Sequence, residues 1–414
     1  MRKQKKMLAR PFAAFAHFPA GFSQIALQEV QEILANPLMP TKFSAKLKVH
    51  KDKIHIQGIH YFQLVELLFR SRILTDLRLV LVEIASSSYS QWQKQLDAFA
   101  PELYFPEPSQ FQCIFKSRNG FIGKQLKDSI QTYFRLTTAE EADFKLYCES
   151  YPKRSHLALS LAGDWLYKRG FRGSLAKSAP IREDIAAATL LQFKNFIGET
   201  LFSLQPYVYI PFAGTGTFLF EFFFLKYDLY PGILREHYSL QDSLFFREQH
   251  FTYLQQKADS VWQEKLIKDE TTQVFCLEKQ KETFTYLQEQ VQHPKLKQWY
   301  KHFRNEKRLQ VQQGDFFHLA SLPTSKPKNN CLFIFLNPPY GKRMQTTSSI
   351  PNYYQKIAKK IREHACNFEK TCGFVYCPNA SSSQAFHKEL QAQQSQTFHF
   401  THGGMDMRCY MFSL

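Results

Sequence analysis

From residue 181 to the end of the chain, short apolar stretches of strand length alternate with longer stretches of helical periodicity, and this alternation constrains the fold most. Residues 185–197 form the first predicted helix, and an apolar helix begins at Phe218. Strands that alternate with helices pair in parallel through right-handed crossovers. We therefore predict an α/β domain with a parallel sheet. Its expected buried strands are residues 207–211, 274–277, 309–312 and 331–336.

The first part of the chain has a different pattern, with short strands and helices in irregular succession. Residues 42–57 have the alternation of a β-hairpin with outward lysines, and residues 23–35 have the apolar face of a helix. Such a mixture favours an α+β domain with an antiparallel sheet. We expect this domain over residues 1–163. A basic linker follows over residues 164–180, and the α/β domain occupies residues 181–414.

The charge balance predicts a polyanionic partner. The chain has 53 Lys and Arg against 36 Asp and Glu, a formal net charge of +17. An aromatic content of 15% argues against disorder. The eight cysteines include no C-x-x-C pair, which argues against a zinc ribbon and a thioredoxin motif. We expect no metal, no membrane span and a cytoplasmic location with reduced thiols, and the sequence leaves the oligomeric state open.

A glycine turn follows the first predicted strand of the α/β domain, in the sequence Pro-Phe-Ala-Gly-Thr-Gly-Thr at 211–217. Glycines let the backbone approach a ligand closely, and the following helix N-terminus supplies amide donors. This arrangement suits a nucleotide-like cofactor at the carboxyl edge of a parallel sheet. A dinucleotide-binding motif has a third glycine where this chain has Leu219, and a simple strand-to-helix turn remains the alternative.

Two carboxylates follow the next predicted strands. Glu278 ends the apolar run at 274–277, where a carboxylate accepts hydrogen bonds from ribose hydroxyls. Asp315 lies just past the strand at 309–312, where it would accept a hydrogen bond from an adenine amino group. Each has an ordinary alternative, a charged strand end for Glu278 and a Gly-Asp turn for Asp315.

The most specific motif is Asn-Pro-Pro-Tyr at 337–340, directly after the apolar strand 331–336. The side-chain oxygen of Asn337 and the carbonyl of Pro338 would accept both hydrogens of an exocyclic amine. Pro338 and Pro339 restrict the turn, and Tyr340 offers a ring on which a base stacks. These are the parts needed to hold the amino group of a flipped base for methylation. The alternative is a Pro-Pro turn that ends a strand.

Taken in order, these motifs resemble the class I S-adenosylmethionine-dependent methyltransferases of the amino-methylating Asn-Pro-Pro-Tyr type. The resemblance is closer to the bacterial THUMP-domain RNA methyltransferases, including the 23S rRNA guanine-N2 methyltransferases. Arg-Gly-Phe-Arg at 169–172 and Ala-Pro-Ile-Arg-Glu at 179–183 match the segment that precedes their catalytic domain. Asn-Pro-Pro-Tyr-Gly-Lys-Arg at 337–343 matches their catalytic motif. Looser matches extend the resemblance over nearly the whole chain.

The resemblance implies a fold and a set of residue roles. The C-terminal domain would be a Rossmann-like class I methyltransferase domain, and the N-terminal domain would be a THUMP plus ferredoxin-like region that binds RNA. The cofactor would be S-adenosyl-L-methionine, with Glu278 on its ribose and Asp315 on its adenine. Asn337, Pro338, Pro339 and Tyr340 form the catalytic set. The residues expected around the methionine part of the cofactor are Pro211, Ala213, Gly214, Thr215, Gly216 and Thr217. The expected RNA phosphate contacts are Lys46, Lys48, Lys51, Arg72, Lys124, Lys127, Arg169 and Arg172.

One position departs from the family pattern. The family has an acid immediately before the motif proline, and this chain has Ile210 there. Glu221, in the following helix, matches another family acid. Because the missing acid helps to hold the amino-acid end of the donor, the departure leaves open a weaker donor site.

We therefore predict methylation of an exocyclic base amine in structured RNA, with guanine N2 of 23S rRNA as the first expectation and rRNA preferred to tRNA. Three alternatives remain. The chain is a tRNA guanine-N2 methyltransferase, a catalytically silent RNA-binding or assembly factor, or a DNA adenine-N6 methyltransferase, which shares the Asn-Pro-Pro-Tyr motif.

Overall fold

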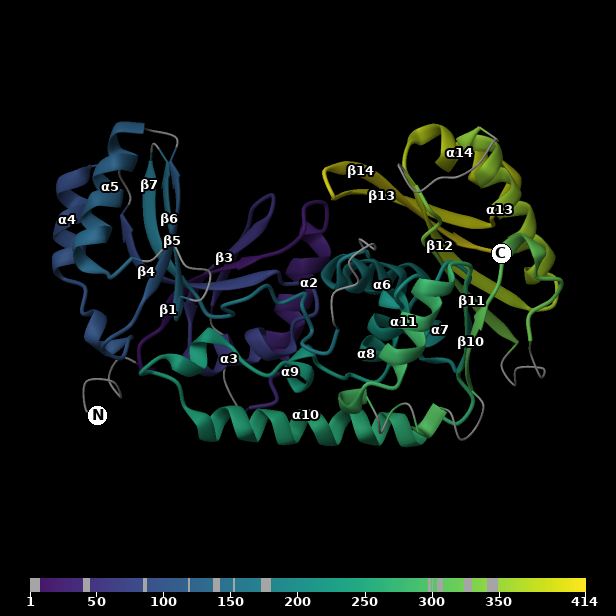
Figure 1. The fold of residues 1–414 in the computed structure, drawn as a ribbon, viewed down its shortest axis with the longest axis horizontal. Helices are drawn as coiled ribbons and strands as arrows, with labels where there is room; N and C mark the ends of the chain where they lie inside the picture. The colour runs from purple at the N-terminus through teal and green to yellow at the C-terminus, as the bar shows by residue number, and fades with distance from the viewer. Residues whose placement is uncertain are drawn as a thin grey trace. The chain divides into compact units, whose positions relative to one another are not determined.

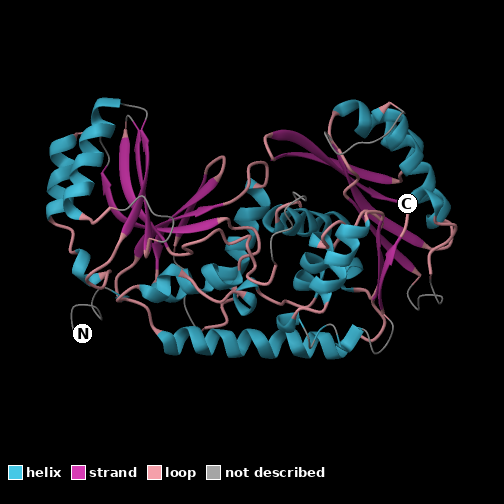
Figure 2. Cartoon of the chain, in the orientation of Figure 1, coloured by secondary structure: helices cyan, strands magenta, loops and turns pink. Residues whose placement is uncertain are grey.

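The computed structural model divides into two compact units, each built from helices and strands (Figure 2). The structure describes residues 8–39, 45–84, 88–117, 120–136, 142–151, 153–172, 180–296, 299, 301–303, 308–323, 330–340 and 349–414, with the backbone alone at 120–123. The first unit comprises Met1–Phe18, Ala26–Gly170 and Pro231–Lys257. The second comprises Pro19–Ile25, Phe171–Tyr230 and Ala258–Leu414.

This division differs from the predicted serial order of domains. The chain passes from one unit to the other at Gly170–Phe171, inside the predicted linker, whose residues 173–179 lie outside the described residues. Residues 231–257 were expected in the second domain but belong to the first unit. The reason is aromatic packing within that unit. The Phe251 ring lies 5.4 Å from the Phe69 ring, and a Cβ atom on Gly232 would lie 2.3 Å from Phe69.

The first unit contains a seven-stranded sheet with the order β2-β3-β1-β4-β7-β6-β5 (Figure 1). Its pairs are antiparallel, as predicted, except for β5 and β6, which are parallel because helix α5 connects them by a crossover. Helices α2 and α10 each have residues in both units. The strands are β1 (Phe12–His17), β2 (Lys46–Val49), β3 (Lys53–Ile59), β4 (Asp76–Ile84), β5 (Phe111–Ser117), β6 (Phe144–Tyr151) and β7 (Arg154–Ser160). The helices are α2 (Ser23–Ala35), α3 (Tyr61–Arg70), α4 (Tyr89–Asp97), α5 (Gly120–Tyr133), α9 (Pro231–Leu234) and α10 (Glu248–Lys268), with 3-10 turns η1 (Pro101–Leu103) and η2 (Ser239–Asp242).

The second unit contains another seven-stranded sheet, with the order β10-β9-β8-β11-β12-β14-β13. Neighbours from β10 to β12 are parallel, as the alternating pattern predicted. The antiparallel hairpin of β13 and β14 at one edge was not predicted. The strands are β8 (Tyr207–Ile210), β9 (Gln273–Glu278), β10 (Leu309–Gln313), β11 (Cys331–Leu336), β12 (Lys370–Cys377), β13 (Gln394–His402) and β14 (Met405–Ser413). The helices are α6 (Glu183–Ile197), α7 (Glu199–Ser203), α8 (Thr217–Lys226), α11 (Lys281–Val291), α13 (Ile350–Ala365) and α14 (Ala380–Leu390), with 3-10 turns η3 (Pro294–Leu296) and η4 (Phe316–His318).

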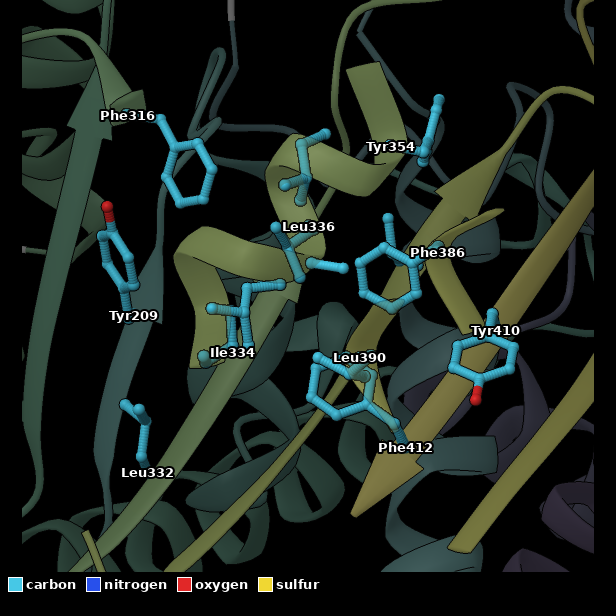
Figure 3. Close-up of a cluster of buried hydrophobic side chains, with 14 of the residues drawn as sticks. Tyr209, Phe316, Leu332, Ile334, Leu336, Tyr354, Phe386, Leu390, Tyr410 and Phe412 are labelled. Carbon is cyan, nitrogen blue, oxygen red and sulfur yellow. The ribbon is translucent and has the colours of Figure 1, made fainter. Parts of the chain in front are cut away.

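Helices cover both faces of the second sheet with apolar side chains. On one face, side chains of α13 and α14 meet strand residues such as Ile334 and Leu336 in one buried cluster (Figure 3). On the other face, the Phe193 ring of α6 lies 5.4 Å from Phe333 and 5.5 Å from Phe335. All six residues of β11 are buried, as expected for a parallel strand with helices on both sides. This packing fixes the strands whose carboxyl ends carry the predicted motifs.

Candidate active site

The predicted cofactor and catalytic motifs meet at one edge of the second sheet. Strands β10, β9, β8 and β11 are neighbours and run parallel, so their carboxyl ends lie side by side. The segments that leave these ends line a cavity of about 950 Å³, the size of a cofactor site. Of the predicted cofactor and catalytic residues, all but Gly216 line it. They are Pro211, Ala213, Gly214, Thr215, Thr217, Glu278, Asp315, Asn337, Pro338, Pro339 and Tyr340.

The glycine turn has the backbone conformation that its sequence predicts. Gly214 and Gly216 have φ angles of +54° and +84°, a region that favours glycine. A Cβ atom on Gly214 would have no atom within 4 Å, so the backbone there faces open space. A Cβ atom on Gly216 would lie 2.4 Å from Leu287. This position therefore needs glycine because of side-chain packing, not because a ligand approaches it. Helix α8 begins directly afterwards at Thr217.

Glu278 connects the glycine turn to strand β9. One carboxylate oxygen accepts a hydrogen bond from the Gly214 amide at 2.8 Å, and the other accepts from the Gln280 amide at 2.9 Å. The Ala213 amide also donates to the Leu277 carbonyl at 3.0 Å. A carboxylate oxygen accepts more than one hydrogen bond, so Glu278 keeps capacity for a ligand hydroxyl at the cavity wall.

Asp315 takes part in a local turn, as the ordinary alternative to a ligand role predicted, and it also lines the cavity. One oxygen accepts from the Phe317 amide at 2.8 Å and caps the turn η4, and the other pairs with Lys279 at 2.9 Å. Burial alone would raise the pKa of Asp315, but the hydrogen bonds from Lys279 and Phe317 lower it below the ordinary value. Asp315 is therefore a charged acceptor at the cavity.

The motif at 337–340 presents an acceptor that lacks a partner. The Asn337 Oδ1 atom is buried and forms no hydrogen bond with any described residue. A buried amide oxygen without a donor costs free energy, about 1–3 kcal/mol in proteins. The Tyr340 side chain, 9% exposed, lines the same cavity. This pairing of an unsatisfied acceptor and an aromatic ring suits a planar ligand that carries an N–H donor.

Arg172, expected to contact RNA phosphate, instead braces the glycine turn. Its guanidinium donates to the Thr217 hydroxyl at 2.8 Å, to the Thr215 carbonyl at 2.9 Å and to the Thr215 hydroxyl. It also pairs with Glu183 on helix α6 at 2.8 Å, and its side chain is 8% exposed. The Arg-Gly-Phe-Arg motif marked Arg172 as a functional residue, but the sequence did not show that its side chain points toward the glycine turn.

Two other arginines differ from their predicted role for the same reason. Arg72 and Arg169 are buried, at 6% and 1% exposure, so they are not surface phosphate contacts in this structure. The Arg169 guanidinium donates to the Arg72 carbonyl at 2.7 Å and to the Leu166 carbonyl at 3.1 Å, which stabilises the end of the first unit. The lysines predicted to contact RNA phosphates differ from these arginines, because each lysine is exposed. They are Lys46, Lys48, Lys51, Lys124 and Lys127.

The structure adds residues that the motifs did not predict. Aromatic rings of Phe212, Phe218, Phe317 and Tyr353 line the cavity, and three lysines of α13 join them. The described lining residues do not include Ile210 or Glu221, which are buried at 1% and 0% exposure. The cavity wall therefore has no carboxylate at the position where the family has its acid.

The doubly covered parallel sheet, the glycine turn after β8, the acid after β9 and the cavity at their shared edge define a class I, Rossmann-like methyltransferase. S-adenosyl-L-methionine is the cofactor of this class, and the open glycine turn, the two carboxylates and the aromatic rings fit it. The chain belongs to the RMKL-like methyltransferase domain family, whose model matches residues 169–410.

Named relatives and solved structures agree with this membership. The chain is 24% identical over 367 residues to the ribosomal RNA large subunit methyltransferase K/L of Shewanella baltica, covering 84% of this chain and 46% of that protein. The enzyme of that name from Saccharophagus degradans is 24% identical over 311 residues, covering 72% and 38%. The chain thus spans about half the length of the curated relatives it matches.

Among solved structures, SMU.472 complexed with SAH has a TM-score of 0.71 at 17% identity, covering 97% of this chain and 98% of that one. A predicted N6-adenine-specific DNA methylase from Listeria monocytogenes has a TM-score of 0.70 at 16% identity, covering 99% and 97%. TrmN from Thermus thermophilus has a TM-score of 0.59 at 13% identity, covering 97% and 99%. At these identities the likeness concerns the fold alone.

The described residues also bear on metal sites and membrane spans. No group of three or more His, Cys, Asp or Glu side chains there is arranged to hold a metal ion. None of the helices in that part of the chain combines the length and the hydrophobicity needed to cross a membrane.

Proposed function

We propose that the chain transfers a methyl group from S-adenosyl-L-methionine to the exocyclic amine of a base in structured RNA, with guanine N2 of 23S rRNA as the expected target. The observation that carries the proposal is the buried Asn337 Oδ1 atom, which has no donor among the described residues and belongs to a residue that lines the cofactor-sized cavity. The names of the curated relatives support ribosomal RNA as the substrate.

The residues around the glycine turn would hold the methyl donor. Pro211 to Thr217 would surround its methionine part, where the open space at Gly214 permits close approach. The Glu278 carboxylate would accept from the ribose hydroxyls, and Asp315 would accept from the adenine amino group. When bound, the donor supplies an activated methyl on a sulfonium. The protein's part is therefore to position the amine and exclude water.

The residues at the other side of the cavity would hold the target base. The amine would donate to Asn337 Oδ1 and to the Pro338 carbonyl, which would turn the nitrogen lone pair toward the methyl group. Tyr340 would support the ring by stacking. Methylation would place a positive charge on the nitrogen, and the methylated amine would then lose one proton to solvent while Asn337 and the Pro338 carbonyl hold it. No strong general base is needed.

The first unit would bind RNA as a THUMP plus ferredoxin-like region. The exposed lysines at positions 46, 48, 51, 124 and 127 support this role, because lysines that neutralise phosphates supply sequence-independent affinity. The large positive net charge of +17 agrees with a polyanionic substrate.

An assay with isotopically labelled methyl donor on rRNA, tRNA and DNA, followed by mass spectrometry of the nucleosides, tests the proposal. We expect label in N2-methylguanosine from rRNA. Label in N6-methyladenosine from DNA would contradict it. If calorimetry detects no binding of S-adenosylmethionine, the chain is instead a silent RNA-binding factor.

A further inference from the structure

Helix α13 presents one continuous face to the cavity. Tyr353, Lys356, Lys359, Lys360 and Glu363 all line it, at the spacing that places residues on one side of a helix. From Tyr353 to Glu363 this face extends about 15 Å along the helix axis. The opposite face packs into the core. Its buried residues are Tyr354, Ile357, Ala358, Ile361 and His364.

Two of the three lysines form no ion pair with a described residue, although the charge of Lys359 also acts on Glu363. Lys360 pairs with Glu363 at 3.0 Å, and this hydrogen bond lowers the pKa of Glu363. Lys356 and Lys359 are exposed, and neither forms a hydrogen bond or an ion pair with another described residue. The helix dipole favours cations only in the last turn, which begins beyond them. The core does not account for these two charges, and the carboxylate that the helix supplies, Glu363, already pairs with Lys360.

The methyl donor does not account for them either. S-adenosylmethionine carries a sulfonium, an ammonium and a single carboxylate, so its net charge is positive and it contains no phosphate. The ammonium groups of Lys356 and Lys359 on the cavity wall therefore have no phosphate of the donor to bind. Their sign instead matches a polyanion that reaches the same cavity.

We propose that Lys356 and Lys359 form a cationic strip that holds backbone phosphates of the RNA next to the target nucleotide. The choice of RNA rests on the proposed function, whereas the strip itself rests on the geometry of α13. Lysines at positions i and i+3 lie about 5–6 Å apart at their Cβ atoms, so adjacent phosphates of one strand are within reach of both side chains. The strip would act after the first unit has bound the RNA, by fixing the strand at the cavity mouth.

The test uses the full-length chain, with Lys356→Gln, Lys359→Gln and the double variant. Lys388→Gln is the matched control, because Lys388 is exposed on α14 and does not line the cavity. The dissociation constant for an RNA stem-loop with a guanine-containing loop is measured over a range of salt concentrations. Each strip substitution should make the slope of log K against log salt shallower by about 0.7–0.9, and the double variant by about twice that. The control should not change the slope.

Binding of S-adenosylmethionine, measured by calorimetry, separates this inference from the proposed function. Unchanged donor affinity in the strip variants supports the inference, because a strip reserved for RNA does not touch the donor. A salt slope for the double variant equal to that of wild type would overturn it, as would a slope change seen only with a DNA stem-loop of the same sequence. A wild-type chain that binds no donor would refute the proposed function. The salt slopes of RNA binding would still show whether Lys356 and Lys359 bind RNA phosphates.

Discussion

The two sheets of the molecule place their polar residues in opposite ways. In the second unit, the central strands β8, β9 and β11 are apolar and buried, and polar residues stand at or just beyond their carboxyl ends, where Glu278 and Asn337 line a cavity. In the first unit, charged residues lie within the strands. Glu149 on β6 pairs with Lys53 on β3 at 3.0 Å, and Arg78 on β4 pairs with Asp76 at 2.7 Å.

The difference teaches where function is to be sought in each unit. Charges that lie along strands pair with one another, and the exposed cations of the first unit include the lysines predicted to contact RNA. Acceptors at the ends of buried parallel strands have no strand partner, so they remain available to a ligand.

Asn337→Ala should abolish most of the activity proposed for the cavity edge. Removal of one preorganised polar group at a reacting centre lowers turnover by roughly a hundredfold to a thousandfold. The affinity for S-adenosylmethionine and for RNA should stay near the wild-type values. Single-turnover methylation assays measure the effect, with Asn352→Ala on the exposed side of α13 as the control. Turnover within threefold of wild type would mean that Asn337 is only part of a turn.

Arg172→Ala should weaken donor binding by about tenfold, or about 1.4 kcal/mol, because three hydrogen bonds from its guanidinium hold Thr215 and Thr217 of the glycine turn in place. A fourth hydrogen bond goes to Glu183 on α6. The KM for the donor should rise more than kcat falls, and Arg172→Lys should recover part of the loss. Arg362→Ala, an exposed arginine of the same unit, is the control. A variant that loses RNA affinity but binds the donor normally would instead support the original RNA-contact role.

The first unit should lose stability in mild acid before the second. Burial lowers the pKa of His55 and of His156 to about 4, and that of His17 in the same unit is lowered as well. Among the described residues of the second unit, burial lowers the pKa of His364 to about 4. A histidine with a lowered folded pKa binds its proton more readily when unfolded. Its contribution to stability is therefore complete above pH 6.5 and is lost as the pH falls toward 4.

Hydrogen exchange of the individual strands measures this loss, with rates corrected for their intrinsic pH dependence. Protection of β7 should fall between pH 6.5 and pH 4 while that of β11 is retained. The variant His156→Gln removes one titrating group and should reduce the pH dependence of β7. Equal losses of protection in both strands would refute the contrast between the sheets.

The smallest effects belong to the exposed lysines of the first unit. Lys46→Gln or Lys48→Gln should reduce the salt slope of RNA binding by about 0.7–0.9 each and leave the unfolding midpoint unchanged. Arg169→Gln should instead leave the salt slope unchanged and lower the unfolding midpoint, since its guanidinium is buried against backbone carbonyls. A large change of salt slope in the arginine variant would restore the role first predicted for it.

The parallel sheet and the motifs at its edge could be predicted from the sequence, because each depends on a local pattern of residues. The apolar run of β11 and the residues that follow it predict both a buried strand and a cavity edge. The direction in which each side chain points could not be predicted from the sequence. Arg72, Arg169 and Arg172 are cations in basic or motif-bearing segments, but packing turns each of them inward. Tertiary contacts that the local pattern does not encode also place residues 231–257 in the first unit.

The central claim is that the edge of the second sheet methylates an RNA base amine. Mass spectrometry of nucleosides from rRNA, tRNA and DNA tests it directly, in a strain that lacks this chain and in the same strain complemented with wild type or Asn337→Ala. The account predicts that N2-methylguanosine disappears from 23S rRNA without the chain and returns only with wild type. Unchanged 23S rRNA together with loss of a methylated nucleoside from tRNA or DNA would contradict it.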